Sequence, residues 1–258
     1  MSTFLFDKTI FGPVKSRRLG NSLGINLLPN TRKVCNFNCI YCECGWNPEN
    51  KVKEKLPDIS EVTFLLEERL KEIKATHEPI DAITFAGNGE PTMHPDFPAI
   101  IDATVGLRNQ YFPDVKIAVL SNATLLYKET IFNSLKKIDL NILKIDSAFK
   151  ETCEILNNPT GRFNIQELVD NLKNFKGKLV VQTMFVKGTF KEHTFDNSTN
   201  IEVAAWLKLI REIAPEFVMV YTIERDTPAN NVQKVTAKRL KEIVDLLGQH
   251  GIDASYSE

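Results

Sequence analysis

Apolar and polar positions alternate along the chain in two different rhythms. Runs rich in β-branched residues, typical of buried strands, cover residues 23–28, 82–86, 117–121, 142–146, 179–186 and 217–223. Between them, apolar residues recur three or four positions apart, as at Val62, Leu66 and Leu70 and again at Val203 and Leu207, which is the spacing of one helix face. Strands and helices in alternation predict βα units around a parallel sheet.

The number of these units indicates the architecture. Five or six βα units fit within 258 residues, whereas a closed eight-unit barrel takes about 250 residues in its repeats alone. We therefore predict an α/β fold, a partial (β/α)6 TIM-like barrel with parallel strands, in which a cysteine-rich loop follows the first strand. The last helix should begin after a cap at Thr236 and end at Gly248.

The domain organisation follows from the absence of any obvious divider in the sequence. The turn-rich stretch 187–200 directly follows a strand, so we expect a loop over the barrel mouth rather than a domain boundary. We find no short repeat or low-complexity tract. We expect a single domain over 1–258, with an N-terminal extension and first strand at 1–34, the cysteine loop at 35–44 and the remaining units at 45–258.

Composition narrows the class of protein. With 43% hydrophobic and 25% charged residues, the chain resembles an ordinary soluble globular protein. No apolar run approaches the roughly 20 residues of a membrane span, and the first residues lack the basic start and apolar stretch of a secretory signal. We expect a cytoplasmic protein with no membrane partner.

Net charge bears on nucleic-acid partners. Lys and Arg number 32 and Asp and Glu 33, so the formal charge of −1 provides no overall attraction to a polyanion. A local basic group stands near the cysteine loop and keeps a nucleic-acid partner as the less favoured alternative; it comprises Lys15, Arg17, Arg18, Arg32 and Lys33.

The cysteines carry the most specific chemical signal. The chain has five, and three follow the spacing Cys35-Asn-Phe-Asn-Cys39-Ile-Tyr-Cys42. Three thiolates in one loop can bind three irons of a [4Fe–4S] cubane and leave the fourth iron open to a non-protein ligand.

A structural zinc site is the alternative, with Cys44 as a fourth ligand. Zinc loops usually separate two CxxC pairs by a dozen or more residues, whereas these four cysteines lie within ten positions. Cys42 and Cys44, one residue apart, are poorly spaced to bind the same ion. We expect Cys44 to be a bystander and Cys153 to pack in the core.

The cysteine spacing resembles the CxxxCxΦC signature of the radical S-adenosylmethionine (SAM) superfamily, where Φ is aromatic and corresponds to Tyr41. The string Gly87-Asn88-Gly89-Glu90 follows a predicted strand and is similar to the superfamily's GGE motif. The resemblance implies that this turn receives the SAM amino group, and glycine permits such a close backbone approach.

The resemblance also implies other contacts to SAM. Polar groups for its ribose and carboxylate would come from strand ends, which is where barrels place active residues, and its adenine would lie near two tyrosines. These further candidates are Ser121, Asn122, Asp146, Ser147, Tyr41 and Tyr221.

At a finer level, residues 12–24 and the strings GNGEPT and Tyr221-Thr-Ile-Glu224-Arg225-Asp resemble radical SAM proteins grouped with the wyosine-type tRNA synthases. Those enzymes carry a second cluster on additional N-terminal cysteines. No cysteine precedes Cys35, and Cys44 and Cys153 are too few to build a second three-cysteine site.

The class implies a [4Fe–4S] cluster and SAM as cofactors, a flavodoxin- or ferredoxin-type reductant, and hydrogen abstraction from a substrate. Catalytic candidates are Lys144, Glu224 and Arg225. Other possible substrate contacts are Arg17, Arg18, Gln182 and Met184. Histidines are expected at the surface, except that His94 follows the GNGEPT turn and could approach the barrel mouth.

Three functions stay open at this point. The favoured one is a radical SAM enzyme acting on a small molecule, nucleobase-like or amino-acid-like. The others are a radical SAM enzyme that modifies RNA or protein, and a non-catalytic iron–sulfur or zinc module.

Overall fold

The computed structural model describes residues 4–16, 18–49 and 54–258. Its helices are α1 (Ile59–Thr76), α2 (Phe97–Tyr111), α3 (Glu129–Leu135), α4 (Lys150–Asn157), α5 (Ile165–Lys173), α6 (Asn200–Ile213) and α7 (Ala237–Gln249), with a short 3₁₀ helix at Pro91–Met93. Its strands are β1 (Ile10–Ser16), β2 (Gly20–Ile25), β3 (Ala82–Phe85), β4 (Lys116–Ser121), β5 (Leu140–Lys144), β6 (Val180–Met184), β7 (Val186–Phe190), β8 (His193–Asp196), β9 (Phe217–Tyr221), β10 (Val232–Lys234) and β11 (Ala254–Ser257).

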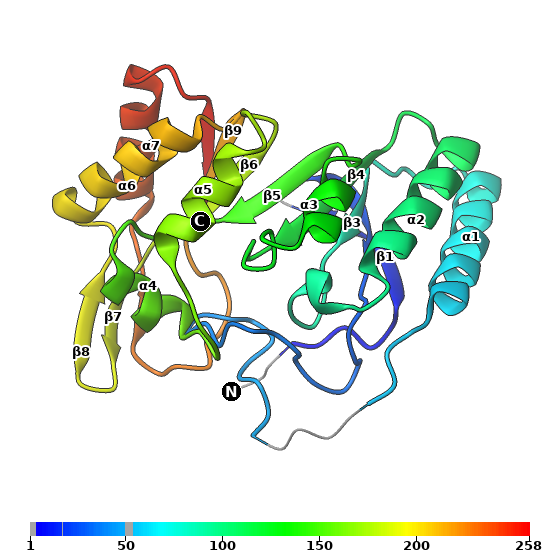
Figure 1. Ribbon diagram of the computed structural model, residues 1–258, viewed down its shortest axis with the longest axis horizontal. Coiled ribbons are helices and arrows are strands. Elements are labelled where there is room, and N and C mark those ends of the chain that lie inside the picture. Colours follow the sequence, from blue (N-terminus) through cyan, green and yellow to red (C-terminus); the bar gives the residue numbers. More distant parts are fainter. Residues whose placement is uncertain (1–3, 17, 50–53) are drawn as a thin grey trace.

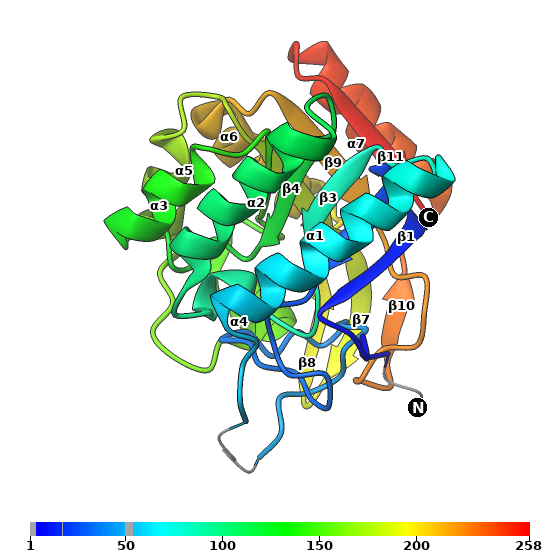
Figure 2. The ribbon, with the colours of Figure 1, turned by 90° about the vertical axis from the view of Figure 1, so that its right-hand side faces the viewer.

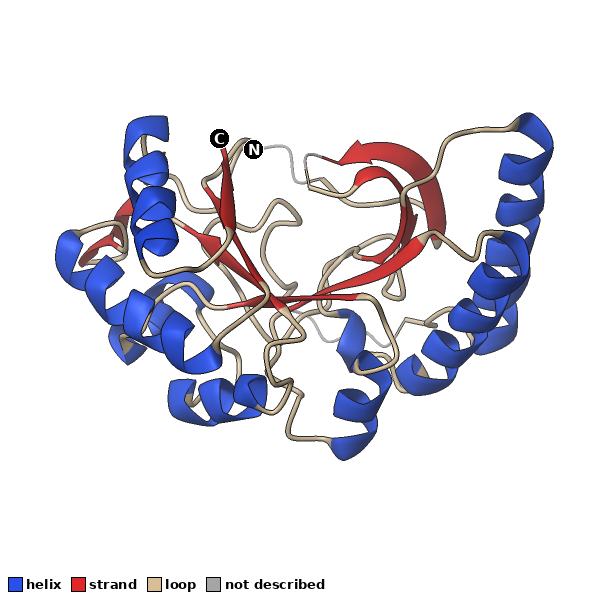
Figure 3. Ribbon diagram, turned by 90° about the horizontal axis from the view of Figure 1, so that it is seen from above, coloured by secondary structure: helices blue, strands red, loops and turns tan. Residues whose placement is uncertain are grey.

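One curved sheet organises the molecule. Its strand order is β1-β2-β3-β4-β5-β6-β9-β11, and all neighbouring pairs are parallel except β1 with β2. Seen from above, the strands form an open arc with helices along its outer side (Figure 3). The predicted α/β partial barrel is confirmed, and the six predicted strand runs correspond to β2, β3, β4, β5, β6 and β9.

The sheet extends beyond the predicted six strands at both ends. β11 adds a seventh parallel strand beside β9, and β1 adds an antiparallel strand beside β2. Both are edge strands, and each is partly exposed along its length, so neither shows the apolar run that identifies a strand buried on both faces.

Residues 187–200 form regular structure, so the prediction of a loop there is wrong. β7 and β8 form a hairpin, and β10 pairs with β7 to complete a small three-stranded sheet. Gly188 permits this pairing: it has φ of +148°, and a Cβ there would lie 1.9 Å from the carbonyl oxygen of Asn231. The strands are short and mostly polar, which hides them from a search for apolar runs.

The helices bury most of the residues that their spacing places on one face, although Leu65 of α1, which shares that spacing, is 37% exposed. Leu66, Leu70 and Ile73 of α1 are fully buried in the main core, as is Trp206 of α6, whose ring nitrogen donates to the Thr183 hydroxyl at 3.1 Å. Burying side chains of this size contributes about 1.5–3 kcal/mol each. This packing fixes the strands whose carboxyl ends carry the site.

The last helix begins as predicted. The Thr236 hydroxyl caps α7 by accepting from the backbone N–H of Arg239, and the helix continues one residue past Gly248 to Gln249. Figures 1 and 2 show α7 running beside β11 at the same end of the sheet. None of the helices in the described part of the chain has both the length and the apolar character to cross a bilayer.

Candidate functional site

The segment that follows β2 carries the cysteines, and backbone hydrogen bonds hold it on two sides. On one side, Val34 N–H donates to the carbonyl of Asn88 at 2.8 Å, and Glu90 N–H donates to the carbonyl of Val34 at 3.1 Å. On the other, Ile40 N–H donates to the carbonyl of Leu156 at 3.0 Å. The cysteine loop is therefore fixed between the glycine turn after β3 and the end of α4.

Three of the cysteines face one cavity of about 290 Å³, namely Cys35, Cys39 and Cys42. Side-chain amides approach two of the sulfurs: Asn122 Nδ2 lies 3.7 Å from Cys35 Sγ, and Asn157 Nδ2 lies 3.8 Å from Cys39 Sγ. Hydrogen bonds to sulfur favour the thiolate that a metal requires. The residues present therefore suit an iron–sulfur cluster.

The other two cysteines do not line the cavity, although the Cys44 thiol donates a hydrogen bond to Cys42. Cys44 Sγ lies 3.6 Å from the carbonyl oxygen of Gly87, and Cys153 is buried with its thiol 3.4 Å from the carbonyl of Ser147. The expected core position of Cys153 is confirmed.

Among the residues that the structure describes, no three or more of His, Cys, Asp and Glu are grouped so as to hold a metal ion. A cubane differs from a zinc site in taking each thiolate on a different iron.

Lys33 brings a positive charge to the loop. It is 2% exposed, and its Nζ donates to the carbonyl of Gly45 at 3.1 Å. Burial alone would lower the pKa of Lys33, but Cys42, Cys39 and Cys35 together outweigh burial and hold that pKa above its usual value. The ammonium is thus stabilised by the same sulfurs that line the cavity.

The cysteines differ in acidity. Burial raises the pKa of Cys39 to about 11 and that of Cys35 further. The pKa of Cys42 is instead lowered to about 5, because the Cys44 thiol donates to it and Lys33 lies nearby. Cys42 is therefore the thiol most ready to deprotonate before metal arrives.

The glycine turn packs directly against the cysteine loop. Gly89 has φ of +138°, and a Cβ there would lie 1.8 Å from the Val34 carbonyl oxygen. A Cβ on Gly87 would meet Asn26 Oδ1 at 2.2 Å. Both glycines line the cysteine cavity, so the turn presents bare backbone to whatever occupies it.

Glu90 closes this turn and joins it to the next strand. Its buried carboxylate accepts from the hydroxyls of Ser121 (2.7 Å) and Thr92 (2.5 Å) and from the backbone N–H of Asn122 (2.7 Å). Burial raises the pKa of Glu90 above its usual value despite these donors. Glu90, Ser121 and Asn122 all line the cavity.

The end of β5 contributes a charged pair. Lys144 Nζ lies 2.6 Å from a carboxylate oxygen of Asp146, and the Tyr41 hydroxyl contacts both groups. Asp146 also accepts from Asn157 Nδ2 at 2.6 Å and from the backbone N–H of Met184 at 3.0 Å. Although burial opposes its charge, Asp146 and neighbouring groups raise the pKa of Lys144. Lys144 and Tyr41 line the cavity, whereas Asp146 supports them from behind.

Some predicted side chains point elsewhere. The Asn88 side chain donates to the carbonyls of Pro29 (2.8 Å) and Phe6 (2.9 Å), so only its backbone serves the cysteine loop. Ser147 is fully buried and its hydroxyl donates to Glu202 at 2.6 Å. Neither residue lines the cavity.

The residues after β9 also differ in position. Glu224 and Arg225 are exposed and do not line the cavity. Arg225 pairs with Glu43 at 2.8 Å and lies over the Phe4 ring. Arg17 lies outside the described residues.

His94 has a different location from the one expected. It is 2% exposed, its Nε2 lies 2.9 Å from the carbonyl oxygen of Pro57, and its Nδ1 accepts from the N–H of Asp96 at 3.1 Å. The ring therefore fixes a turn. It does not line the cavity, so the expectation that His94 could approach the barrel mouth is wrong. The other histidines are exposed as expected, at positions 77, 193 and 250.

Other residues complete the far wall. Arg18, Gln182, Met184 and Tyr221 line the cavity as the sequence suggested, and the Arg18 guanidinium stacks 5.0 Å above the Tyr221 ring. Asn157 links Cys39 to Asp146. The sequence offered no sign of this residue, because a position at the end of α4 does not reveal a contact with Cys39, 118 residues away.

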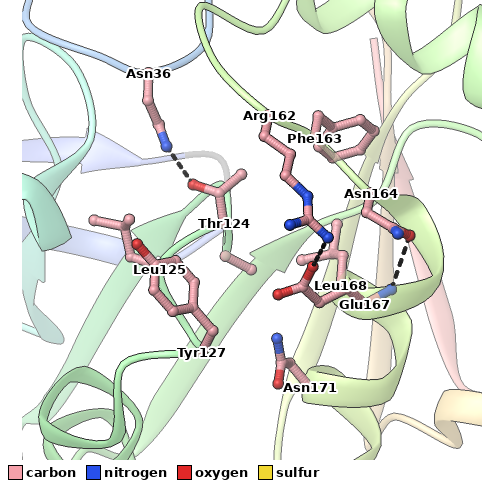
Figure 4. Close-up of a pocket in the computed structure, with 11 residues that line it drawn as sticks. Asn36, Thr124, Leu125, Tyr127, Arg162, Phe163, Asn164, Glu167, Leu168 and Asn171 are labelled. Carbon is pink, nitrogen blue, oxygen red and sulfur yellow. Dashed lines mark hydrogen bonds and ion pairs between the residues drawn. The ribbon is translucent and has the colours of Figure 1, made fainter.

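A second cavity, of about 510 Å³, lies beside the cysteine loop (Figure 4). Asn36 borders it and donates to the Thr124 hydroxyl at 2.5 Å, while Arg162 and Glu167 pair at 3.7 Å on the opposite side from Thr124. It contains no cysteine and none of the predicted SAM contacts. The cysteine cavity is therefore the candidate site.

Comparison with known proteins agrees with this site. A family model of the radical SAM superfamily matches residues 30–200, a span that includes the cysteine loop, the glycine turn and strands β3 to β8. The chain belongs to the radical SAM superfamily. Membership makes it an enzyme of this class, with a [4Fe–4S] cluster and SAM as its cofactors.

Two curated relatives are similar over most of this chain. It is 30% identical over 242 residues to a protein named GTPase Obg from Brachyspira hyodysenteriae, a match that covers 92% of this chain and 33% of that protein. It is 32% identical over 206 residues to a UPF0026 protein from Helicobacter pylori, covering 78% of this chain and 62% of that one. The chain thus spans between one third and about three fifths of these relatives' lengths.

Among solved structures, a radical SAM methyltransferase from Sphaerobacter thermophilus shares the fold. The TM-score is 0.66 at 12% identity, and the match covers 92% of this chain and 65% of the other. At this identity the likeness concerns the fold alone. The resemblance to wyosine-type enzymes stays a prediction.

Proposed function

We propose that this chain reductively cleaves SAM at a [4Fe–4S] cluster bound by Cys35, Cys39 and Cys42, and abstracts hydrogen from a small nucleobase-like or amino-acid-like substrate. The observation that carries the proposal is that these three cysteines, the glycine turn and the polar strand ends all line one cavity. We also propose that residues 1–258 act as a single domain.

When bound, the cluster and SAM supply a 5′-deoxyadenosyl radical, which is the difficult part of the chemistry. The residues of this chain bind SAM and the substrate, orient them and exclude water. Gly87 and Gly89 offer main-chain groups to SAM, with the Glu90 carboxylate beside them, whereas the backbone of Asn88 is used by Val34 and Asn26. Asn88 and Glu90 of this turn are buried, whereas Gly87 and Gly89 are half-buried where they line the cavity.

The strand ends have two kinds of role in this proposal. Ser121, Asn122, Tyr41 and Tyr221 contact SAM, whereas Asp146 acts indirectly by holding Lys144 and Tyr41. Lys144 carries a firmly held positive charge on the cavity wall. Ser147 serves the structure of α4 and α6 rather than SAM.

The basic group near the loop supports a small substrate over RNA. Lys33 is buried, and Arg32 lies 3.2 Å from Glu54. Arg18 turns into the cavity. Lys15 is exposed, and Arg17 lies outside the described residues. Lys33, Arg32 and Arg18 therefore do not add to an exposed basic surface of the kind that binding to phosphate backbones requires.

A tracer experiment tests the proposed reaction. Reduced, anaerobic enzyme would be incubated with SAM and candidate small molecules that carry deuterium at one C–H position. Deuterium recovered in 5′-deoxyadenosine identifies the substrate. Modification of a tRNA or peptide, with no transfer from any small candidate, would instead support the alternative.

A further inference from the structure

Arg18 carries a charge that nothing in the described part of the chain neutralises. No carboxylate of the described residues forms an ion pair with its guanidinium, and its Nη1 is buried without a hydrogen-bond partner. A buried, unpaired donor of this kind is costly, and more so when the group is charged. Such a group in a cavity wall suggests that a ligand supplies the missing acceptor.

The neighbouring charges of the cavity are already used. Lys144 pairs with Asp146 at 2.6 Å, and Glu43 pairs with Arg225 at 2.8 Å. Glu90 accepts from hydroxyls and a backbone N–H. Arg18 is therefore left to receive an anion from outside.

The Tyr221 ring orients this group. The guanidinium carbon lies 5.0 Å from the ring centroid, a cation–π contact. The N–H donors of a guanidinium lie in its own plane, where they can form two parallel hydrogen bonds to a carboxylate or phosphate.

We propose that Arg18 binds an anionic oxygen group of the substrate, a carboxylate or a phosphate ester, on the wall of the cysteine cavity. The inference rests on the proposed function, because it places that group in the same 290 Å³ enclosure as Cys35, Cys39 and Cys42. A substrate whose anionic end is held there lies at the cavity that the cysteines line.

The test is calorimetric titration of cluster-reconstituted, SAM-loaded protein with inorganic phosphate and, separately, with acetate. The proteins compared are wild type, Arg18→Gln, Arg18→Lys and the control Arg162→Gln, whose side chain is 86% exposed beside the second cavity. Iron content and SAM affinity are measured first for each.

We expect wild type to bind at least one anion, and the preferred anion to show whether the substrate group is a phosphate or a carboxylate. Arg18→Gln should weaken that binding roughly tenfold or more, since charge-assisted bidentate bonds are lost. Arg18→Lys should recover it only in part, and Arg162→Gln should resemble wild type. SAM affinity should stay unchanged in all.

Several outcomes would overturn the inference. The first is that wild type binds neither anion, and the second is that Arg18→Gln binds the anion as tightly as wild type. The third is that Arg18→Gln also loses SAM affinity, which would mean that Arg18 binds SAM itself. Wild-type protein that takes up no iron or SAM would instead count against the proposed function.

Discussion

Lys33 brings a positive charge into a buried position behind the cysteine loop. The pKa of this lysine is raised because the three cysteines favour its charged form. Reduction of an iron–sulfur cluster adds a negative charge, and nearby charge is one of the factors that set its potential. The lysine is thus well placed to make reduction easier.

We predict that Lys33→Met lowers the reduction potential of the cluster, because the ammonium no longer stabilises the added electron. The measurement is a redox titration followed by electron paramagnetic resonance. Lys55→Met is the control, since that side chain is 80% exposed. A Lys33→Met protein with a full cluster at the wild-type potential would contradict this role.

The cysteine assignments make a separate prediction. Reconstituted wild-type protein should bind about four irons, and Cys35→Ala, Cys39→Ala or Cys42→Ala should each lose most of this iron. Cys44→Ala and Cys153→Ala should keep it, because neither residue lines the cavity. Iron analysis and the visible absorption spectrum provide the readout; a full cluster in any of the first three variants would refute the ligand set.

Gly89 couples SAM binding to the cysteine loop. A Cβ at this position would meet the Val34 carbonyl at 1.8 Å, so Gly89→Val should lose iron as well as SAM cleavage, not SAM cleavage alone. Gly106→Ala is the control, because its Cβ would meet nothing within 4 Å, and alanine should stabilise α2 by about 0.5–1 kcal/mol. Normal iron content in Gly89→Val would show that the loop tolerates the displacement.

At the scale of elements, the turn between β3 and α2 is fixed by a buried histidine. Burial lowers the pKa of His94, more than the Pro57 carbonyl and Asp96 raise it. The unfolded chain, with an ordinary histidine pKa of about 6.5, therefore binds a proton at higher pH than the folded chain. Protonation favours unfolding, so this contribution to stability is complete above about pH 6.5 and is lost as the pH falls below it.

We therefore predict that the free energy of unfolding of wild type falls more between pH 7 and pH 5 than that of His94→Gln. Urea denaturation at each pH measures this difference. His250→Gln, altered at an exposed site, should follow wild type. Identical pH dependence in wild type and His94→Gln would mean that the ring is not protonated more readily on unfolding.

At the scale of elements, the sequence predicts those strands and helices whose apolar residues form continuous runs or recur at a regular spacing. The runs that became β3 and β6 are continuous and buried, and the cysteine spacing and the GNGE turn are local signals that need no knowledge of the fold. The β7–β8 hairpin was missed because short polar strands resemble a loop. The contacts of Asn157, Arg18 and His94 depend on chain segments far apart in sequence, which only the folded structure brings together.

For the whole molecule, the open arc of strands is what allows one cavity to collect groups from so many segments. The cysteine loop follows β2, the glycine turn follows β3, and polar residues follow β4 and β5. In parallel α/β sheets the carboxyl ends of strands lie along one edge, where ligands bind. The proposed function requires all of these segments to act on one bound SAM molecule.

The most direct test of that claim is SAM cleavage by the reconstituted protein. Wild type and Cys39→Ala would be incubated anaerobically with SAM and dithionite, and 5′-deoxyadenosine and methionine measured by liquid chromatography with mass detection. We predict that both products form with wild type and stay at background with Cys39→Ala. Wild-type protein that carries a full cluster but forms no 5′-deoxyadenosine, or equal product from Cys39→Ala, would contradict the account.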